Sequence, residues 1–167
     1  KTVTFAYTGE GQWSSMMDGE GGRTSYSYDA AGRRTLLITP QNGRTTFSYD
    51  DAGRCLLQRN ANGTVASYTY DAADRMNVLY NKTSGDLPRS GFVYGYDATG
   101  NRITVSEPSG TKTTWSYDAT NQLVNEKRTA AAGDAYGSYN TTFTYDQVGN
   151  RLVKNASGGL TTSTYDL

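Results

Sequence analysis

The side chains most able to do chemistry in this chain are aspartates, most of which follow a tyrosine. Carboxylates can bind a metal ion or transfer a proton, and both functions need oxygen ligands or carboxyl groups placed close together. Histidine is absent from the 167 residues. Its absence excludes a Ser–His or Cys–His nucleophile and any histidine-ligated metal.

The aspartates are spaced too widely for either function. Asp97–Asn101 and Asp146–Asn150 are the segments most similar to a calcium loop, but such a loop needs more closely spaced oxygen ligands. Asp50 and Asp51 are adjacent, so their side chains should diverge, and no glutamate partner is evident. We expect each aspartate to cap the backbone of a turn, with calcium binding as the weaker alternative. We predict no catalytic residue, no cofactor and no metal.

The Tyr-Asp pair recurs at a nearly constant interval. From a degenerate first copy at Tyr7-Thr8, successive tyrosines are 21, 21, 21, 26, 21, 28 and 20 residues apart. A constant period of this length indicates a repeat architecture. The complete pairs are Tyr28-Asp29, Tyr49-Asp50, Tyr70-Asp71, Tyr96-Asp97, Tyr117-Asp118, Tyr145-Asp146 and Tyr165-Asp166.

Each repeat is predicted to begin with a strand and a turn. An aromatic and then a small residue precede the tyrosine in most copies, as in Phe47-Ser48-Tyr49. This period of two indicates a strand with one aromatic face and one small polar face. Four residues after the tyrosine comes a residue that tolerates positive φ, so Asp-x-x-Gly is a turn whose aspartate accepts backbone N–H bonds. That place holds Gly11, Gly32, Gly53, Asp74, Gly100, Asn121 or Gly149.

A second strand and a second turn complete the repeat, as in residues 33–39 and 40–43. Asn-Gly between strand patterns is a strong hairpin signal. The extra residues of the 26- and 28-residue repeats fall near Asp86-Leu87-Pro88-Arg89 and Ala130–Gly133. We predict lengthened hairpin loops at both places, because loops absorb insertions at low cost. No segment has a sustained helical period.

The single cysteine and the arginines also have structural interpretations. Cys55 occupies a strand position that other copies fill with unrelated residues, and a free cysteine usually behaves as a small apolar residue. The arginines after the turns are matched by the aspartates of the same repeats, and the net charge is zero. A basic face for nucleic acid is therefore not expected, and Arg–Asp pairing between neighbouring turns is favoured.

Tyrosine must supply most of the buried area. Leu, Ile, Val and Phe together make up only 24 of 167 residues, whereas there are 14 tyrosines. We expect same-face aromatics on neighbouring strands to stack as cross-strand pairs. The core would then be a thin ladder along the array, and a long sheet of this kind should curl or be covered.

The repeat resembles a known family. Tyr28-Asp29-Ala30-Ala31-Gly32-Arg33 and its copy at residues 49–54 resemble the RHS/YD repeat, as do the variants Gly100-Asn101-Arg102 and Gly149-Asn150-Arg151. The resemblance covers essentially the whole chain. It implies long antiparallel strands in a spiralling sheet, which closes around a toxic domain in bacterial toxins and forms a similar shell in animal teneurins. An Asp-Pro-x-Gly-Leu-like segment, associated with self-cleavage in shell-forming members, is missing, so that activity is not expected.

The predicted fold is all-β, an antiparallel β-hairpin repeat array that forms a spiralling or curled sheet. Residues 1–167 should form a single array of about eight repeats. The sequence begins inside a strand pattern and stops just after a Tyr-Asp pair. We therefore expect either an internal piece of a longer array or a subunit that polymerises through its strand edges.

The leading functional hypothesis is a structural, non-enzymatic segment in the wall of a shell that encloses a toxin or another cargo. One alternative is a self-assembling extracellular or cell-surface filament, and another is an adhesion module that binds glycans or proteins. The expected partners are further repeats or identical subunits, an encapsulated toxin domain and possible glycans, with no nucleic acid. No stretch is long and apolar enough to span a membrane, and we expect a secreted or cell-surface bacterial protein.

The residues expected to carry this function are those that build the wall. Trp13 lies outside the aromatic register and is the best candidate for a ligand contact. The structural positions are Tyr7, Tyr28, Asp29, Gly32, Tyr49, Asp50, Gly53, Tyr70, Asp71, Tyr96, Asp97, Gly100, Tyr117, Asp118, Tyr145, Asp146, Gly149, Tyr165 and Asp166.

Overall fold

The computed structural model describes residues 1–85, 87–156 and 159–165, and the regular elements within these ranges are all strands. The strand order follows the chain, and the described pairings are antiparallel. The predicted all-β hairpin array is therefore confirmed. The strands are β1 (Thr4–Tyr7), β2 (Trp13–Met17), β3 (Arg23–Tyr28), β4 (Arg34–Ile38), β5 (Arg44–Tyr49), β6 (Cys55–Arg59), β7 (Val65–Tyr70), β8 (Met76–Lys82), β9 (Pro88–Tyr96), β10 (Arg102–Ser106), β11 (Lys112–Tyr117), β12 (Leu123–Thr129), β13 (Tyr139–Tyr145), β14 (Arg151–Ala156) and β15 (Gly159–Thr162).

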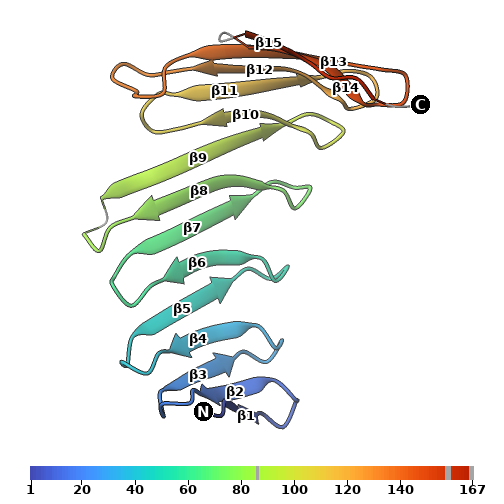
Figure 1. Ribbon diagram of the computed structural model, residues 1–167. Helices are drawn as coiled ribbons and strands as arrows, with labels where there is room; N and C mark the ends of the chain where they lie inside the picture. The colour runs from blue at the N-terminus through green and yellow to red at the C-terminus, as the bar shows by residue number, and fades with distance from the viewer. Residues whose placement is uncertain (86, 157–158, 166–167) are drawn as a thin grey trace. The chain divides into compact units, whose positions relative to one another are not determined.

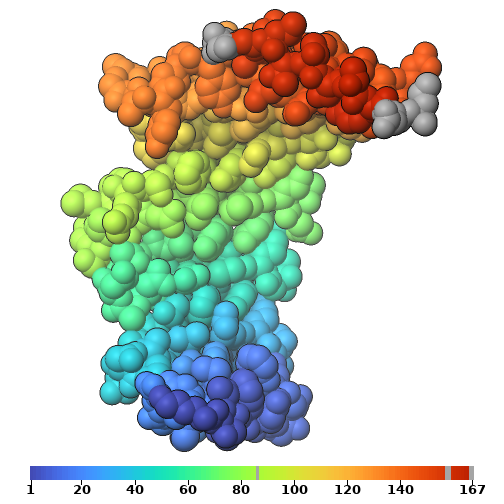
Figure 2. Space-filling view, viewed as in Figure 1, coloured from blue at the N-terminus to red at the C-terminus, as the bar shows by residue number. Residues whose placement is uncertain are grey.

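Two compact units divide the chain, one from Lys1 to Ser90 and one from Gly91 onward. Within each unit, Figure 1 shows the strands following one another in chain order, and the colour bands of Figure 2 keep the same order. The contacts described between strands join consecutive strands. Each hairpin therefore depends on its immediate neighbours, as in other repeat proteins.

The interior of the array is thin, as predicted. Ala66 is the single buried apolar residue of the described ranges, and the other buried side chains there are small and polar. In β5 the half-buried Phe47 and Tyr49 alternate with exposed residues such as Ser48. The alternation confirms the predicted period of two. It also shows that the tyrosine face is only half covered within this chain.

The Tyr-Asp turns share one construction. In the first complete copy, the N–H of Gly32 donates to the C=O of Asp29 and the N–H of Asp29 donates to the C=O of Arg33, each at 2.9 Å. Gly32 has a φ of 77°, and the corresponding Asp74 and Asn121 have 62° and 64°. A turn followed by a left-handed residue produces a β-bulge, and the register shifts between Ser27 and Tyr28. The predicted turn and its positive φ are confirmed.

The two insertions have different outcomes. Residues 130–138 form a loop between β12 and β13, which confirms the lengthened loop predicted there. The prediction for residues 86–89 was wrong for Pro88 and Arg89, because both belong to β9. The N–H of Thr83 donates to the C=O of Leu87 at 2.9 Å, so the connection stays short, and the extra residues lengthen the strands. Asp86 lies outside the described residues.

Replacing Gly53 with alanine should lower the free energy of unfolding by about 1 kcal/mol, because an L-residue is strained at positive φ. Gly53 has a φ of 85°. An added Cβ would meet its nearest atom, on Arg33, at 3.8 Å, so a steric clash is not the cause.

Asn42→Gly is the matched control, since Asn42 has a φ of 60° and glycine adopts that conformation without strain. Urea denaturation of both variants checks the prediction. Equal stability of Gly53→Ala and the parent chain would contradict it.

Candidate functional site

The aspartate of each turn binds the backbone of that turn. Oδ1 of Asp29 accepts the N–H groups of Ala31 at 3.0 Å and Arg33 at 2.9 Å. The same pair of contacts recurs at Asp71 and Asp118. The backbone N–H of Arg33 is the main reason that the pKa of Asp29 is lowered, because it stabilises the charged carboxylate. The predicted capping role is confirmed.

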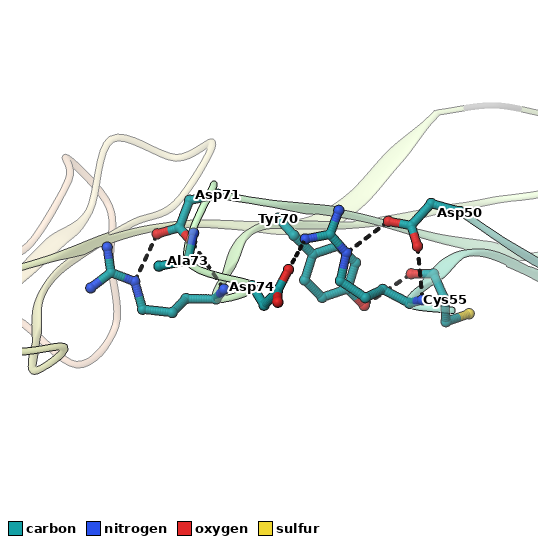
Figure 3. Close-up of polar contacts among 8 residues, drawn as sticks. Asp50, Cys55, Tyr70, Asp71, Ala73 and Asp74 are labelled. Atoms are coloured by element: carbon teal, nitrogen blue, oxygen red, sulfur yellow. Dashed lines mark hydrogen bonds and ion pairs between the residues drawn. The ribbon is translucent and has the colours of Figure 1, made fainter. Parts of the chain in front are cut away.

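The arginine after the turn joins two neighbouring turns. Nε of Arg54 lies 2.7 Å from Oδ2 of Asp50 in its own turn, and Nη1 lies 2.5 Å from Oδ1 of Asp74 in the next. The guanidinium carbon lies 4.8 Å from the centroid of the Tyr70 ring. Figure 3 shows Asp50, Tyr70 and Asp74 gathered around this contact. One side chain therefore binds a carboxylate in each turn and covers an aromatic ring between them.

Arg33 repeats the arrangement one repeat earlier. Its Nε lies 2.7 Å from Oδ2 of Asp29, its Nη1 donates to the C=O of Asp50 at 2.8 Å, and its guanidinium lies 5.0 Å from the Tyr49 ring. Arg–Asp pairing between neighbouring turns was predicted from the sequence. The Arg54–Asp74 ion pair confirms this pairing. Further ion pairs, Arg33–Asp29, Arg54–Asp50 and Arg75–Asp71, form within one turn.

Tyrosine hydroxyls form hydrogen bonds to the backbone of the preceding repeat. Tyr49 donates to the C=O of Arg34 at 2.8 Å, Tyr70 to that of Cys55 at 2.9 Å and Tyr117 to that of Arg102 at 3.0 Å. Each acceptor is the residue that follows the turn of the preceding repeat. The bulge there supplies a carbonyl that the hydroxyl reaches.

The predicted stacking of aromatic rings between neighbouring strands is confirmed for Phe5 and Trp13 and was wrong for the other described rings. Within the described residues, ring–ring contacts occur at Phe5–Trp13 and Phe92–Tyr94. Elsewhere a guanidinium lies against the ring, as for Arg34 on Phe47, Arg102 on Trp115 and Arg151 on Phe143. Cation–π contacts therefore replace many of the expected aromatic pairs.

A second polar cluster, in the 130–138 loop, was missed by the sequence analysis. Arg128 lies 2.5 Å from Oδ2 of Asp134, and the hydroxyl of the buried Thr111 donates to the same oxygen at 2.8 Å. The hydrogen bond from Arg128 is the main cause of the lowered pKa of Asp134. The only signal in the sequence is an arginine and an aspartate that flank an insertion, which does not show that their side chains meet.

The remaining predicted residues are placed as follows. Trp13 is 49% exposed and packs on Phe5 with ring centroids 5.0 Å apart, so its ligand role stays a prediction. Asp166 lies outside the described residues.

Burial raises the pKa of the Cys55 thiol, which disfavours the reactive thiolate. In the described ranges no three metal-ligating side chains meet, and no helix there is long and apolar enough to cross a membrane.

Comparison with known proteins identifies a family and a fold. The sequence matches the RHS Repeat family at residues 7–44, 49–86 and 96–135. The structure resembles a chain of the Photorhabdus luminescens Tc holotoxin pore, with a TM-score of 0.78 and 18% identity. It also resembles a chain of the TcdB2–TccC3 crystal structure, with a TM-score of 0.77 and 19% identity. Both alignments cover 93% of this chain and 9% of the other. No curated protein matches the sequence.

Tyr70→Phe should lower the free energy of unfolding by about 1 kcal/mol, because it removes the hydrogen bond to the Cys55 carbonyl and leaves the ring in place. Tyr136→Phe is the control, since Tyr136 is 89% exposed and its ring lies at the surface. Chemical denaturation of the two variants should separate them. Equal losses would show that the hydroxyl contact is not specific.

Acid should destabilise the fold. The pKa values of Asp29, Asp71 and Asp118 are lowered in the folded chain from an ordinary value of 3.8, so the unfolded chain binds protons more readily. The stabilisation is therefore present above about pH 4 and is lost as the pH falls through the lowered values.

Thermal unfolding between about pH 7 and about pH 2 measures this dependence. Asp71→Asn should flatten it in part, because an asparagine oxygen can still accept the backbone N–H bonds but does not titrate. A melting temperature that stays constant over the whole range would contradict the assignment.

Proposed function

Because the chain belongs to the RHS repeat family, we propose that it forms part of a structural wall that encloses a toxin or another cargo. It acts without catalysis, as one array of about eight repeats within a longer polypeptide that is secreted or displayed at the cell surface. The observation that carries the proposal is the set of side-chain contacts between repeats, here called ties. In the clearest case, Arg54 forms ion pairs with Asp50 and Asp74 and covers the ring of Tyr70.

A wall needs lateral strength without a thick core, and these ties supply it. The backbone hydrogen bonds of a sheet hold neighbouring strands together. The arginine and tyrosine side chains add a second set of bonds across the repeat boundaries. Half-exposed aromatic residues leave the sheet able to contact a chain held against it. The similarity of fold to chains of Tc toxin structures is consistent with this role.

The denaturing mass of the native polypeptide, taken from its source and detected with an antibody to this chain, tests the proposal first. We expect a mass many times larger than the 18.2 kDa of the chain, because this chain aligns with only 9% of each related Tc toxin chain. A native mass of about 18.2 kDa in a long particle would contradict the shell and favour a filament joined at its strand edges.

Protease protection tests enclosure itself. A polypeptide segment enclosed by the wall should resist protease in the native particle. The same protease should cleave that segment rapidly once acid or denaturant has opened the array. Rapid cleavage of the same segment in the intact native particle would contradict enclosure. Binding of the 167-residue chain to a glycan array, lost on replacing Trp13, would instead favour the adhesion alternative.

A further inference from the structure

The turn that follows Tyr96 is among those that lack the arginine covering the tyrosine of the next repeat. Asn101 occupies the place of Arg33 and Arg54, and its Nδ2 donates to Asp97 at 3.0 Å and to Asn121 at 2.7 Å. These contacts join the two turns as arginine does. The asparagine side chain is shorter, however, and no guanidinium of the described residues stacks on Tyr117. The neighbouring Arg102 lies on Trp115 instead, at 4.7 Å.

An open hollow of about 600 Å³ lies at this place. Its lining includes Asp97, Asn101, Trp115, Tyr117 and Asp118. A related hollow lies beside Tyr28 at the Gln12 turn, which also lacks the arginine. Both hollows lie at turns in which an uncharged side chain, Gln12 or Asn101, holds the arginine position.

The lining of the hollow beside Tyr117 also includes the carboxylate of Asp118, which forms no ion pair with a described residue. Oδ1 of Asp118 accepts hydrogen bonds from the backbone N–H of Thr120 and of Gln122, each at 2.9 Å. Oδ2 of Asp118 has no partner among the described residues, whereas the matching oxygens of Asp29, Asp50 and Asp71 each bind an arginine. Asp118 is accordingly exposed, and the hollow has no positively charged residue in its lining.

We propose that this hollow binds an arginine side chain of another polypeptide. The chain itself provides a partial template, because Arg54 lies on the ring of Tyr70 between Asp50 and Asp74. Asp97 and the neutral Asn121 hold these two places beside Tyr117. The carboxylate of Asp118 in the same lining supplies a further negative group. A guanidinium is planar, stacks on an aromatic ring and donates in several directions, so it fits this combination of groups better than an ammonium does. The partner is therefore a polypeptide with an exposed arginine.

The site does not depend on the proposed wall function. It follows from the contrast between the Asn101 turn and the arginine-containing turns of the same chain. A native mass that contradicts the shell would not affect the proposed arginine site. Failure of the peptide experiment below would not affect the proposed wall.

A blocked Ala-Arg-Ala peptide is the probe, and the fluorescence of Trp115 reports its binding. The chain has two tryptophans, so the 167-residue Trp13→Phe variant leaves Trp115 as the only reporter. We expect a saturable change in fluorescence with the arginine peptide. The matching citrulline peptide, which has the same shape without the charge, should bind roughly tenfold more weakly or not at all. Equal binding of the two peptides would overturn the proposal.

Asn101→Arg should abolish peptide binding and keep or raise the unfolding midpoint, because the new side chain can cover Tyr117 from within. Asn150→Arg is the matched control in another turn and should bind the peptide as the parent does. Asp118→Asn should weaken binding while the asparagine oxygen still caps the turn, which provides a second test if Asn101→Arg does not fold. Undiminished binding by either folded Asn101→Arg or Asp118→Asn would overturn the proposal.

Discussion

A carboxylate that accepts two backbone N–H groups holds each turn in the conformation from which the other contacts follow. With Oδ1 of Asp29 bound to the backbone, Oδ2 is free to orient Nε of Arg33. The guanidinium then lies on the tyrosine of the next repeat. The left-handed residue creates the bulge whose flanking carbonyl accepts the next tyrosine hydroxyl. Removing the turn conformation would therefore disturb contacts on both sides of it.

This arrangement explains how a sheet with few buried apolar side chains can be ordered. Hydrophobic burial scales with the apolar area removed from water, and the described residues include just one buried apolar side chain. Polar contacts and cation–π contacts at the repeat boundaries supplement that burial. They are local, so the stability of the array is close to a sum over neighbouring repeats.

The local structure could be predicted from the sequence because spacing determines it. Phe47-Ser48-Tyr49 has the period of a strand, and Gly32 stands where a turn needs positive φ. The ring contacts could not be predicted in the same way. Which group covers Tyr70 depends on the direction in which the Arg54 side chain leaves the bulge, and the spacing of residue types does not reveal that direction. Pro88 was misplaced because insertions can lengthen strands as well as loops.

Mechanical force would act on this chain through its strand order. Because each described strand contact joins consecutive strands, a pull applied to the two ends of either unit loads the hydrogen bonds of one hairpin at a time. Such bonds separate one after another, as in a zipper, and not all together as in sheared parallel strands. The array would therefore unravel from an edge in steps of one strand. Its extension would release the chain gradually at low force, and the steps at Arg33 and Arg54 would need more force than steps without such contacts, because their side chains join two turns.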